Sequence, residues 1–172
     1  MKSIVERCRN DLSMEVVHPA EGHRLLKLAR KAFGNDIGWN ELHLWLRPSW
    51  RYAVILKDGK KRIGYAILEF GWDGPDFCMY VHEIGIIPGK RNMRSLLALL
   101  RHLLRTAEEA GVAYIDAHMV ESTSYRLLTS GFIKKFGWDW YHHGDKSYGV
   151  LNGTNVPAIG VRLFKLHSDE RR

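Results

Sequence analysis

Three cationic side chains stand where an apolar helical pattern begins, and their chemistry is that of anion binding. Lys90, Arg91 and Arg94 precede leucines spaced as on one face of a helix. The first turn of a helix leaves backbone N–H groups unpaired at the positive end of the helix dipole, so a phosphate binds well there. An arginine fork adds paired hydrogen bonds to phosphate oxygens. A solvated basic helix start without a ligand is the alternative interpretation.

The charge of the whole chain points in the same direction. Lys and Arg number 26 against 19 Asp and Glu, for a net charge of +7, which favours nucleotides, acidic proteins or nucleic acid as partners. No nucleic-acid-binding motif accompanies the charge, and no metal-ligand spacing occurs, so neither nucleic acid nor a metal is expected. The two cysteines, Cys8 and Cys78, are far apart in sequence. They indicate a reduced, cytoplasmic protein.

Further polar and aromatic groups each leave two interpretations open. Asp116 and His118 share one face of a predicted strand, where they form either a structural pair or part of a site. The aromatic and histidine side chains of 138–143 line an acceptor pocket or pack at the rim of the core. Those of 39–50 belong to a docked helix or to a patch that binds a protein partner or a second copy of the chain.

Strands and helices must alternate along the chain to position these groups. Hydrophobic periodicity predicts helices over 20–33, 40–46 and 122–130, and a longer one that carries the leucines of 96–104 and ends at Gly111. It predicts strands over 14–18, 51–56, 62–70, 77–87, 112–120, 132–141 and 159–166. Residues 57–60 read as a hairpin turn and 144–157 as a long loop.

This order predicts an α/β (α+β) fold with a mixed, mostly antiparallel sheet of six to seven strands and helices on both faces. The 172 residues, 45% of them hydrophobic, suit a single domain over 1–172 with a core over about 14–166. No run approaches the ~18 apolar residues of a membrane span, and the first residues lack the apolar stretch of a signal peptide. No membrane association is therefore expected.

The segment from Glu83 to Arg91 and the helix after it resemble the GCN5-related N-acetyltransferase (GNAT) superfamily. In that family the central strand ends V-x-P-x-x-R, and the arginine opens the motif R-x-x-G-x-G/A before a helix. With Arg91 as the motif arginine, the family's helix positions are filled by Leu99, Leu100, Leu103 and Ala107. The segment 124–132 resembles the family's second signature, a short helix that ends in Gly-Phe. The resemblance spans about 14–166.

The resemblance implies an acetyltransferase that uses acetyl-CoA as co-substrate and an amine-bearing small molecule or protein as acceptor. It implies that the pyrophosphate lies on the loop formed by Arg91, Asn92, Met93, Arg94, Ser95 and Leu96. It also implies that the N–H of Ile86 or Ile87 binds the thioester carbonyl.

Catalytic roles follow from the same resemblance. Glu83 lies where several relatives place a general base, although a strand-end carboxylate paired with an arginine is the alternative. His82 points to the opposite face of a regular strand. The family's tyrosine acid falls at Leu127 or Leu128 here, which leaves the nearby Tyr125 as the candidate acid.

One departure from the family bears on function, because Arg94 and Leu96 occupy the places of the two motif glycines. Either Lys90, Arg91 and Arg94 bind the phosphates with their side chains, or the site has closed. The first case gives an acyl-CoA-dependent N-acetyltransferase. The second gives a catalytically inactive binding or structural module, similar to accessory or virion proteins of tailed phages.

Overall fold

The computed structural model describes residues 12–34, 51–120, 125–126, 130–144, 147–151 and 154–166. The helix predicted over 40–46 lies outside the described residues, and so does most of the one predicted over 122–130, where Tyr125 and Arg126 are helical. Within the described part of the chain, no helix has the length and apolar character that a membrane span needs.

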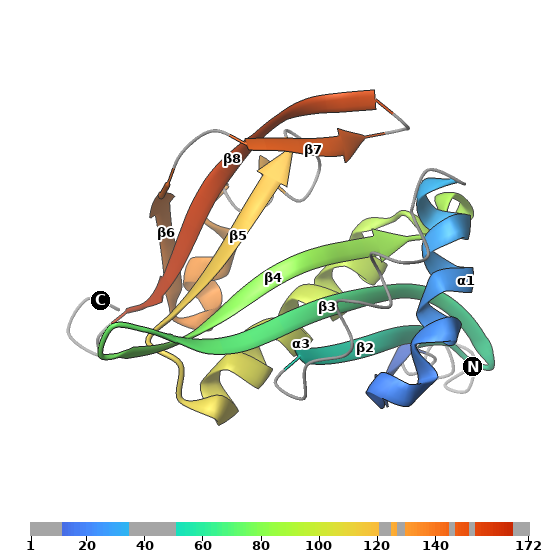
Figure 1. The fold of residues 1–172 in the computed structure, drawn as a ribbon, viewed down its shortest axis with the longest axis horizontal. Helices are drawn as coiled ribbons and strands as arrows, with labels where there is room; N and C mark the ends of the chain where they lie inside the picture. Colours follow the sequence, from blue (N-terminus) through green and yellow to red (C-terminus); the bar gives the residue numbers. More distant parts are fainter. Residues whose placement is uncertain are drawn as a thin grey trace, which may run out of the picture. The chain divides into compact units, whose positions relative to one another are not determined.

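The strands form one mixed sheet in the order β1-β2-β3-β4-β5-β8-β6, and β7 also pairs with β8 (Figure 1). β4 and β5 are parallel, whereas β1 pairs antiparallel with β2, and β8 pairs antiparallel with β5, β6 and β7. The predicted mixed, mostly antiparallel sheet is therefore confirmed. The strands are β1 (Leu12–Val17), β2 (Arg51–Asp58), β3 (Lys61–Asp73), β4 (Asp76–Ile86), β5 (Tyr114–Val120), β6 (Trp138–His142), β7 (Ser147–Leu151) and β8 (Thr154–Lys165).

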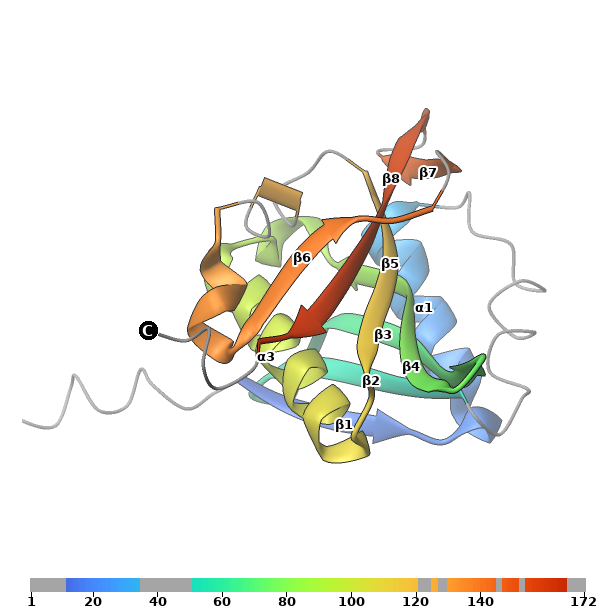
Figure 2. The same cartoon turned by 90° about the vertical axis from the view of Figure 1, so that its left-hand side faces the viewer.

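Within unit 1, described helices lie on both sides of the sheet. α1 (Gly22–Phe33) and the first half of α3 (Met93–Ala110) lie on different faces of β2 and β3 (Figures 1 and 2). Both helices have the apolar stripe that the sequence predicts, with Leu25 and Ala29 buried in α1, and Leu99 and Leu103 buried in α3. Three 3₁₀ turns complete the described structure: η1 (Pro19–Glu21), η2 (Pro88–Lys90) and η3 (Phe132–Phe136).

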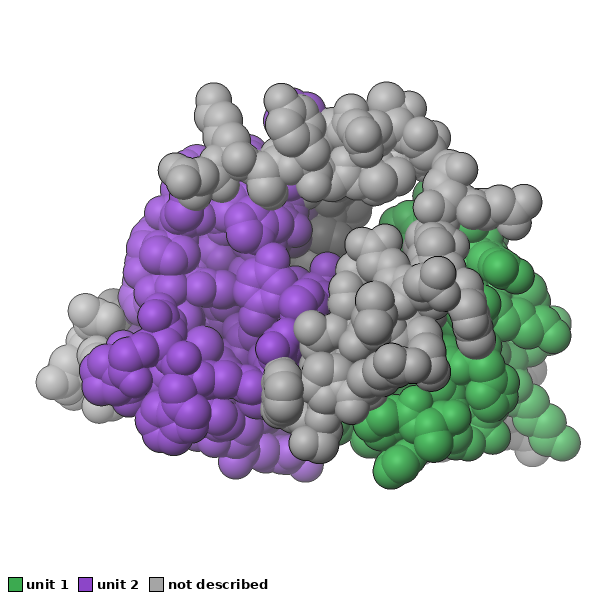
Figure 3. Space-filling view, viewed as in Figure 1, with its two compact units in different colours: residues 1–67, 84–102 green, residues 68–83, 103–172 purple. Residues whose placement is uncertain are grey.

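The chain divides into two compact units, which Figure 3 colours separately. Unit 1 consists of Met1–Ile67 and Ile84–His102, and unit 2 of Leu68–Glu83 and Leu103–Arg172. β3, β4 and α3 each run from one unit into the other, so neither unit is a single continuous segment. The single domain predicted over 1–172 stays a prediction.

The core of unit 1 joins α1 to the first strands. Side chains from α1 pack with those of β1, β2 and β3, and Phe33 and Ile87 lie against this cluster. Gly85 of β4 is needed here, because a Cβ atom would collide with the rings of Tyr65 and Phe33. The cluster consists of Val17, Leu25, Leu26, Leu28, Ala29, Ala32, Ala53, Ile55, Tyr65 and Ile67.

In unit 2, β8 lies in the middle of the sheet. One of its edges pairs with β5 from Ala158 to Phe164, and the other pairs first with β7 and then with β6. Gly160 allows the backbone of His143 to lie close to β8, because a Cβ atom at residue 160 would collide with the carbonyl oxygen of His143. The N–H of His143 donates to Gly160 O at 2.9 Å. Buried side chains include Met79, Leu104, Ala107, Ile115, Ile133, Trp138 and Leu163.

Two predictions of secondary structure were wrong in unit 2. The strand predicted over 132–141 begins only at Trp138, because residues 132–136 form η3 between Gly131 and Gly137, both of which have positive φ. The loop predicted over 144–157 contains β7 and the first residues of β8, which pair with each other. The second difference adds one strand to the seven predicted.

Candidate functional site

The turn between β4 and α3 lies in unit 1 and uses most of its backbone donors internally. The N–H of Lys90 donates to Ile87 O at 2.9 Å, that of Arg91 to Pro88 O at 3.3 Å and that of Asn92 to Lys90 O at 2.9 Å. Pro88 begins this 3₁₀ turn, because its fixed φ suits a first helical position and it has no N–H to leave unpaired. The turn is therefore closed by its own backbone hydrogen bonds where α3 begins.

Asn92 caps α3. Its Oδ1 accepts the N–H of Ser95 at 2.9 Å, and its carbonyl accepts the N–H of Leu96 at 3.1 Å. Ser95 and Leu96, both predicted to lie on the pyrophosphate loop, are buried and have their N–H groups occupied. The N–H groups of Met93 and Arg94 have no acceptor in the described part of the chain. Among the described residues of the predicted pyrophosphate loop, the N–H groups of Met93 and Arg94 are therefore the ones available to an anion. Both lie at the positive end of α3.

Basic side chains flank this helix start. Lys90 Nζ lies 2.8 Å from Oδ2 of Asp58, which stands at the end of β2. The hydrogen bond and charge of Lys90 hold the pKa of Asp58 below its ordinary value, and Arg94 and Lys61 add to this effect through their charges. Arg94 itself is exposed on the first turn of α3. The positive charge around the turn is therefore only partly balanced by Asp58.

Arg91 is directed differently from its basic neighbours. Its Nε donates to Ile86 O at 2.9 Å, and its Nη2 donates to Ala32 O, in the last turn of α1, at 2.5 Å. Both acceptors are main-chain carbonyls of unit 1, so the guanidinium group binds the protein itself. This finding contrasts with the direct phosphate contact considered for Arg91 from the sequence.

Ile86 and Ile87 are the two predicted N–H donors for a thioester carbonyl. The N–H of Ile87 already donates to Ile63 O at 2.9 Å, and the Ile87 side chain packs on the core of unit 1. A donor held in a sheet hydrogen bond is not open to a ligand. The role predicted for Ile86 or Ile87 stays a prediction, and Ile87 is the one of the two whose N–H the sheet already holds.

The two candidate catalytic residues, Glu83 and Tyr125, belong to unit 2. Glu83 is half-buried in β4. The hydroxyl of Tyr125 lies 3.2 Å from Nε2 of His142, and its ring meets Trp140 edge-on at 6.2 Å. Tyr125 therefore has a histidine within proton-exchange distance, whichever direction the hydrogen bond takes.

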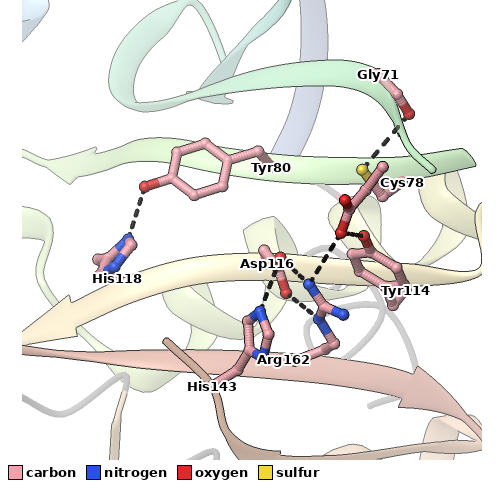
Figure 4. Close-up of polar contacts among 9 residues, drawn as sticks. Gly71, Cys78, Tyr80, Tyr114, Asp116, His118, His143 and Arg162 are labelled. Carbon is pink, nitrogen blue, oxygen red and sulfur yellow. Dashed lines mark hydrogen bonds and ion pairs between the residues drawn. The ribbon is translucent and has the colours of Figure 1, made fainter. Parts of the chain in front are cut away.

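A polar cluster in unit 2 gives Asp116 and His118 different partners from the pair they were considered to form (Figure 4). Both oxygens of Asp116 accept hydrogen bonds from Arg162, each at 2.7 Å, and the Arg162 guanidinium lies 3.6 Å from the ring centroid of Tyr114. His118 Nδ1 lies 2.8 Å from the hydroxyl of Tyr80. The bidentate ion pair raises the pKa of Arg162 and ties β5 to β8.

Tyrosines of this cluster stay protonated at neutral pH. Burial raises the pKa of Tyr114, and the hydrogen bond from its hydroxyl to Asp73 adds to the effect. Burial also raises the pKa of Tyr80, with smaller contributions from the charges of Asp116 and Glu69. Both hydroxyls can therefore act as hydrogen-bond donors.

Sequence reasoning missed the contact between His82 and Glu69 in unit 2. His82 Nε2 lies 2.5 Å from Oε2 of Glu69, and the His82 ring meets Tyr80 edge-on at 4.6 Å. A carboxylate next to an imidazole orients the ring, as in catalytic acid–base pairs. The signal in the sequence is the spacing of Tyr80 and His82, two residues apart on one strand. Among the described residues, no group of three His, Cys, Asp or Glu could hold a metal ion.

Comparison with known proteins places this architecture in a known family. A family model described as Acetyltransferase (GNAT) family matches residues 22–132, which is more than half of the chain. No curated protein matches the chain at a significant level.

Several solved structures share the fold. The ribosomal-protein-S18-alanine N-acetyltransferase from Escherichia coli has a TM-score of 0.65 at 16% identity, over 94% of this chain and 98% of its own. An IAA acetyltransferase from Bacillus cereus has a TM-score of 0.64 at 17% identity, over 90% and 99%. A GNAT family acetyltransferase from Elizabethkingia anophelis with acetyl-CoA bound has a TM-score of 0.62 at 14% identity, over 92% and 100%.

Proposed function

Because this chain belongs to the acetyltransferase (GNAT) family, we propose that it transfers an acetyl group from acetyl-CoA to a primary amine. The acceptor is an amine of a small molecule or of a protein, and the similar Escherichia coli enzyme is named for an alanine of ribosomal protein S18. The observation that supports donor binding most directly is the capped start of α3. There, Asn92 fixes the first turn and leaves the N–H groups of Met93 and Arg94 without an acceptor in the described part of the chain.

In this proposal the pyrophosphate of acetyl-CoA lies at the first turn of α3. Two backbone N–H groups and the helix dipole attract it, and the exposed side chain of Arg94 supplies a cationic fork. Lys90, although paired with Asp58, adds positive charge near the turn. Side-chain charge thus takes over part of the role that glycine N–H groups have in the family motif. The acetyl-CoA found in the Elizabethkingia anophelis structure supports the same donor here.

Acetyl transfer requires three further contributions from the protein. We assign the N–H of Ile86 to the thioester carbonyl, where it stabilises the negative oxygen of the tetrahedral intermediate. Glu83 accepts the proton of the attacking amine, and Tyr125 donates a proton to the departing thiolate of coenzyme A. The His142 side chain, 3.2 Å from the Tyr125 hydroxyl, can return that proton. The amine nitrogen then carries the acetyl group, and coenzyme A leaves as the free thiol.

Calorimetric titration with acetyl-CoA tests donor binding. The wild type should release or take up heat and gain thermal stability, because the ligand binds only the folded chain. Arg94→Glu should abolish binding, since it places a carboxylate beside the phosphates. Arg101→Glu is the matched control, because it reverses an exposed charge on the same helix about two turns away, and it should bind as the wild type does.

The outcome separates the two functions that the sequence allows. Absence of heat and of a thermal shift at millimolar acetyl-CoA would refute the transferase proposal and favour the inactive binding or structural module. Equal binding by wild type and Arg94→Glu would place the donor elsewhere.

We further propose a reducing, cytoplasmic location, which is supported by the free thiol of Cys78.

A further inference from the structure

Arg91 stands beside the proposed donor site, yet its side chain turns away from it. The guanidinium group donates to two main-chain oxygens, Ile86 O at 2.9 Å and Ala32 O at 2.5 Å. These acceptors come from the end of β4 and from the last turn of α1. Arg91 therefore ties its own turn and the nearby end of β4 to the end of α1, which is 59 residues away in sequence, and all of these residues lie in unit 1.

The contact with α1 satisfies a group that helix geometry leaves unpaired. The last four carbonyls of a helix have no intrahelical donor, and they carry the negative end of the helix dipole. Gly34, with φ of 85°, satisfies one of these carbonyls by donating its N–H to Arg30 O at 2.9 Å. Arg91 reaches Ala32, and its positive charge suits that end of the helix.

The contact with β4 fixes the other end of the link. Ile86 is the last residue of the strand, and the next N–H, that of Ile87, is held by Ile63 O at 2.9 Å. The Arg91 side chain thus binds the last residue of the strand that precedes it, and this bond spans the turn Pro88–Lys90. The position of the Met93 and Arg94 N–H groups depends on that turn, because α3 begins immediately after it.

We propose that Arg91 is a positioning residue, which orients the donor-binding turn by tying it to the end of α1 and does not itself bind phosphate. This inference rests on the proposed function, since it assigns Arg91 a role in binding the same donor. Binding and positioning are reciprocal, so a ligand that orders the turn must also stabilise the end of α1. The N–H of Gly34 reports on that end.

Arg91→Lys separates the geometry of the side chain from its charge. Lysine keeps the positive charge but presents a single ammonium head, and it cannot donate in two fixed directions from Nε and Nη2. If Arg91 positions the turn, Arg91→Lys should weaken coenzyme A binding about tenfold or more, as expected for loss of a hydrogen bond to a charged group. If Arg91 acts by its charge, Arg91→Lys should bind as the wild type does, which would overturn the proposal.

Salt dependence provides a second distinction from a phosphate ligand. Contacts between exposed charges weaken as salt rises. Arg94→Gln should therefore lose most affinity at low salt and show a flatter salt dependence. Arg91→Lys should lose affinity for coenzyme A by the same factor at low and at high salt, as measured by calorimetry. A salt dependence flattened in Arg91→Lys as in Arg94→Gln would contradict the positioning role.

Hydrogen exchange at Gly34 tests the link without any ligand. In the free protein, Arg91→Lys should exchange the Gly34 N–H faster than the wild type, and unchanged exchange would overturn the proposal. If Arg91→Lys fails to fold, the wild type still provides a test: saturating coenzyme A should slow exchange at Gly34, and no change would refute the coupling.

The two proposals fail in different ways. A wild type that binds no coenzyme A refutes the proposed function, and the positioning role falls with it. A wild type that binds, together with an Arg91→Lys variant that binds equally well, refutes only the positioning role.

Discussion

Replacement of Gly85 by alanine should destabilise the protein through a collision within unit 1. The added methyl would lie 2.9 Å from Tyr65 Cζ and from Phe33 Cε2, and closer still to Tyr65 Cε1. The Tyr65 side chain is fully buried, so its ring cannot move into solvent. Overpacking of a core costs about 1–3 kcal/mol. Alanine in a strand regains about 0.5–1 kcal/mol relative to glycine. The expected net loss is about 1–2 kcal/mol.

A matched variant isolates the steric part of this loss. Gly71 is also a strand glycine, but a Cβ atom there meets nothing within 4 Å and its φ is not positive. Gly71→Ala should therefore be neutral or slightly stabilising, and the difference between the two variants should equal the cost of the collision with Tyr65.

Urea unfolding followed by circular dichroism measures the free energy of unfolding of both variants. Thermal melts should show a fall of about 2–8 °C for Gly85→Ala, which is the expected loss converted for a chain of this size. If Gly85→Ala is as stable as Gly71→Ala, then Tyr65 and Phe33 do not pack against β4 as described, and the reasoning is refuted.

Three further predictions concern the turn and the proposed chemistry. Asn92→Ala should cost about 1 kcal/mol of stability by removing the cap on the Ser95 N–H; Asn92→Asp should keep the stability but weaken coenzyme A binding in calorimetry, and unimpaired binding would argue against a phosphate there. The lowered pKa of Asp58 means that its pair with Lys90 stabilises the fold above the ordinary carboxyl pKa of 3.8 and is lost as pH falls through the lowered pKa. In Asp58→Asn the free energy of unfolding should therefore fall less steeply as pH decreases than in the wild type. An unchanged fall would show that the pair contributes nothing to stability. Glu83→Gln should lower turnover in a coenzyme A release assay without weakening donor binding, and unchanged turnover would remove Glu83 from the mechanism.

Much of the fold could be predicted because its signals are local. The hairpin between β2 and β3 follows from Lys57–Lys60, where Gly59 has the positive φ that such a turn favours. The parallel pairing of β4 and β5 follows from the long amphipathic pattern of α3 between them. Those two predictions needed only the period of apolar residues and a turn residue.

The two errors in secondary structure have different causes. β7 lies in a stretch rich in Gly, Asn, Ser and Thr, and it forms because β8 supplies its hydrogen-bond partners. The strand predicted over 132–141 includes η3, although Phe132, Ile133 and Phe136 follow helical spacing, and Ile133 is the one that is fully buried. Tertiary pairing in the first case and a misjudged period in the second account for the differences.

The site shows the same division. The sequence located the helix start and its basic residues, because Lys90, Arg91 and Arg94 directly precede the leucines of the apolar stripe. It could not show that Arg91 binds two carbonyls, since Ala32 is 59 residues away. Nor could it pair Asp116 with Arg162, 46 residues apart. A cation in a sequence carries no information about whether its partner is a ligand or the protein backbone.

The central place of β8 constrains the order in which unit 2 can assemble during synthesis. β8 follows the seven other strands of the described residues along the chain, yet it fills the gap between β5 and β6 and provides the only described partner of β7. Until residues 154–165 have left the ribosome, β5 and β6 each present an unpaired edge, and such edges recruit other strands. Nascent chains of this protein should therefore depend on protection from aggregation until the last strand arrives.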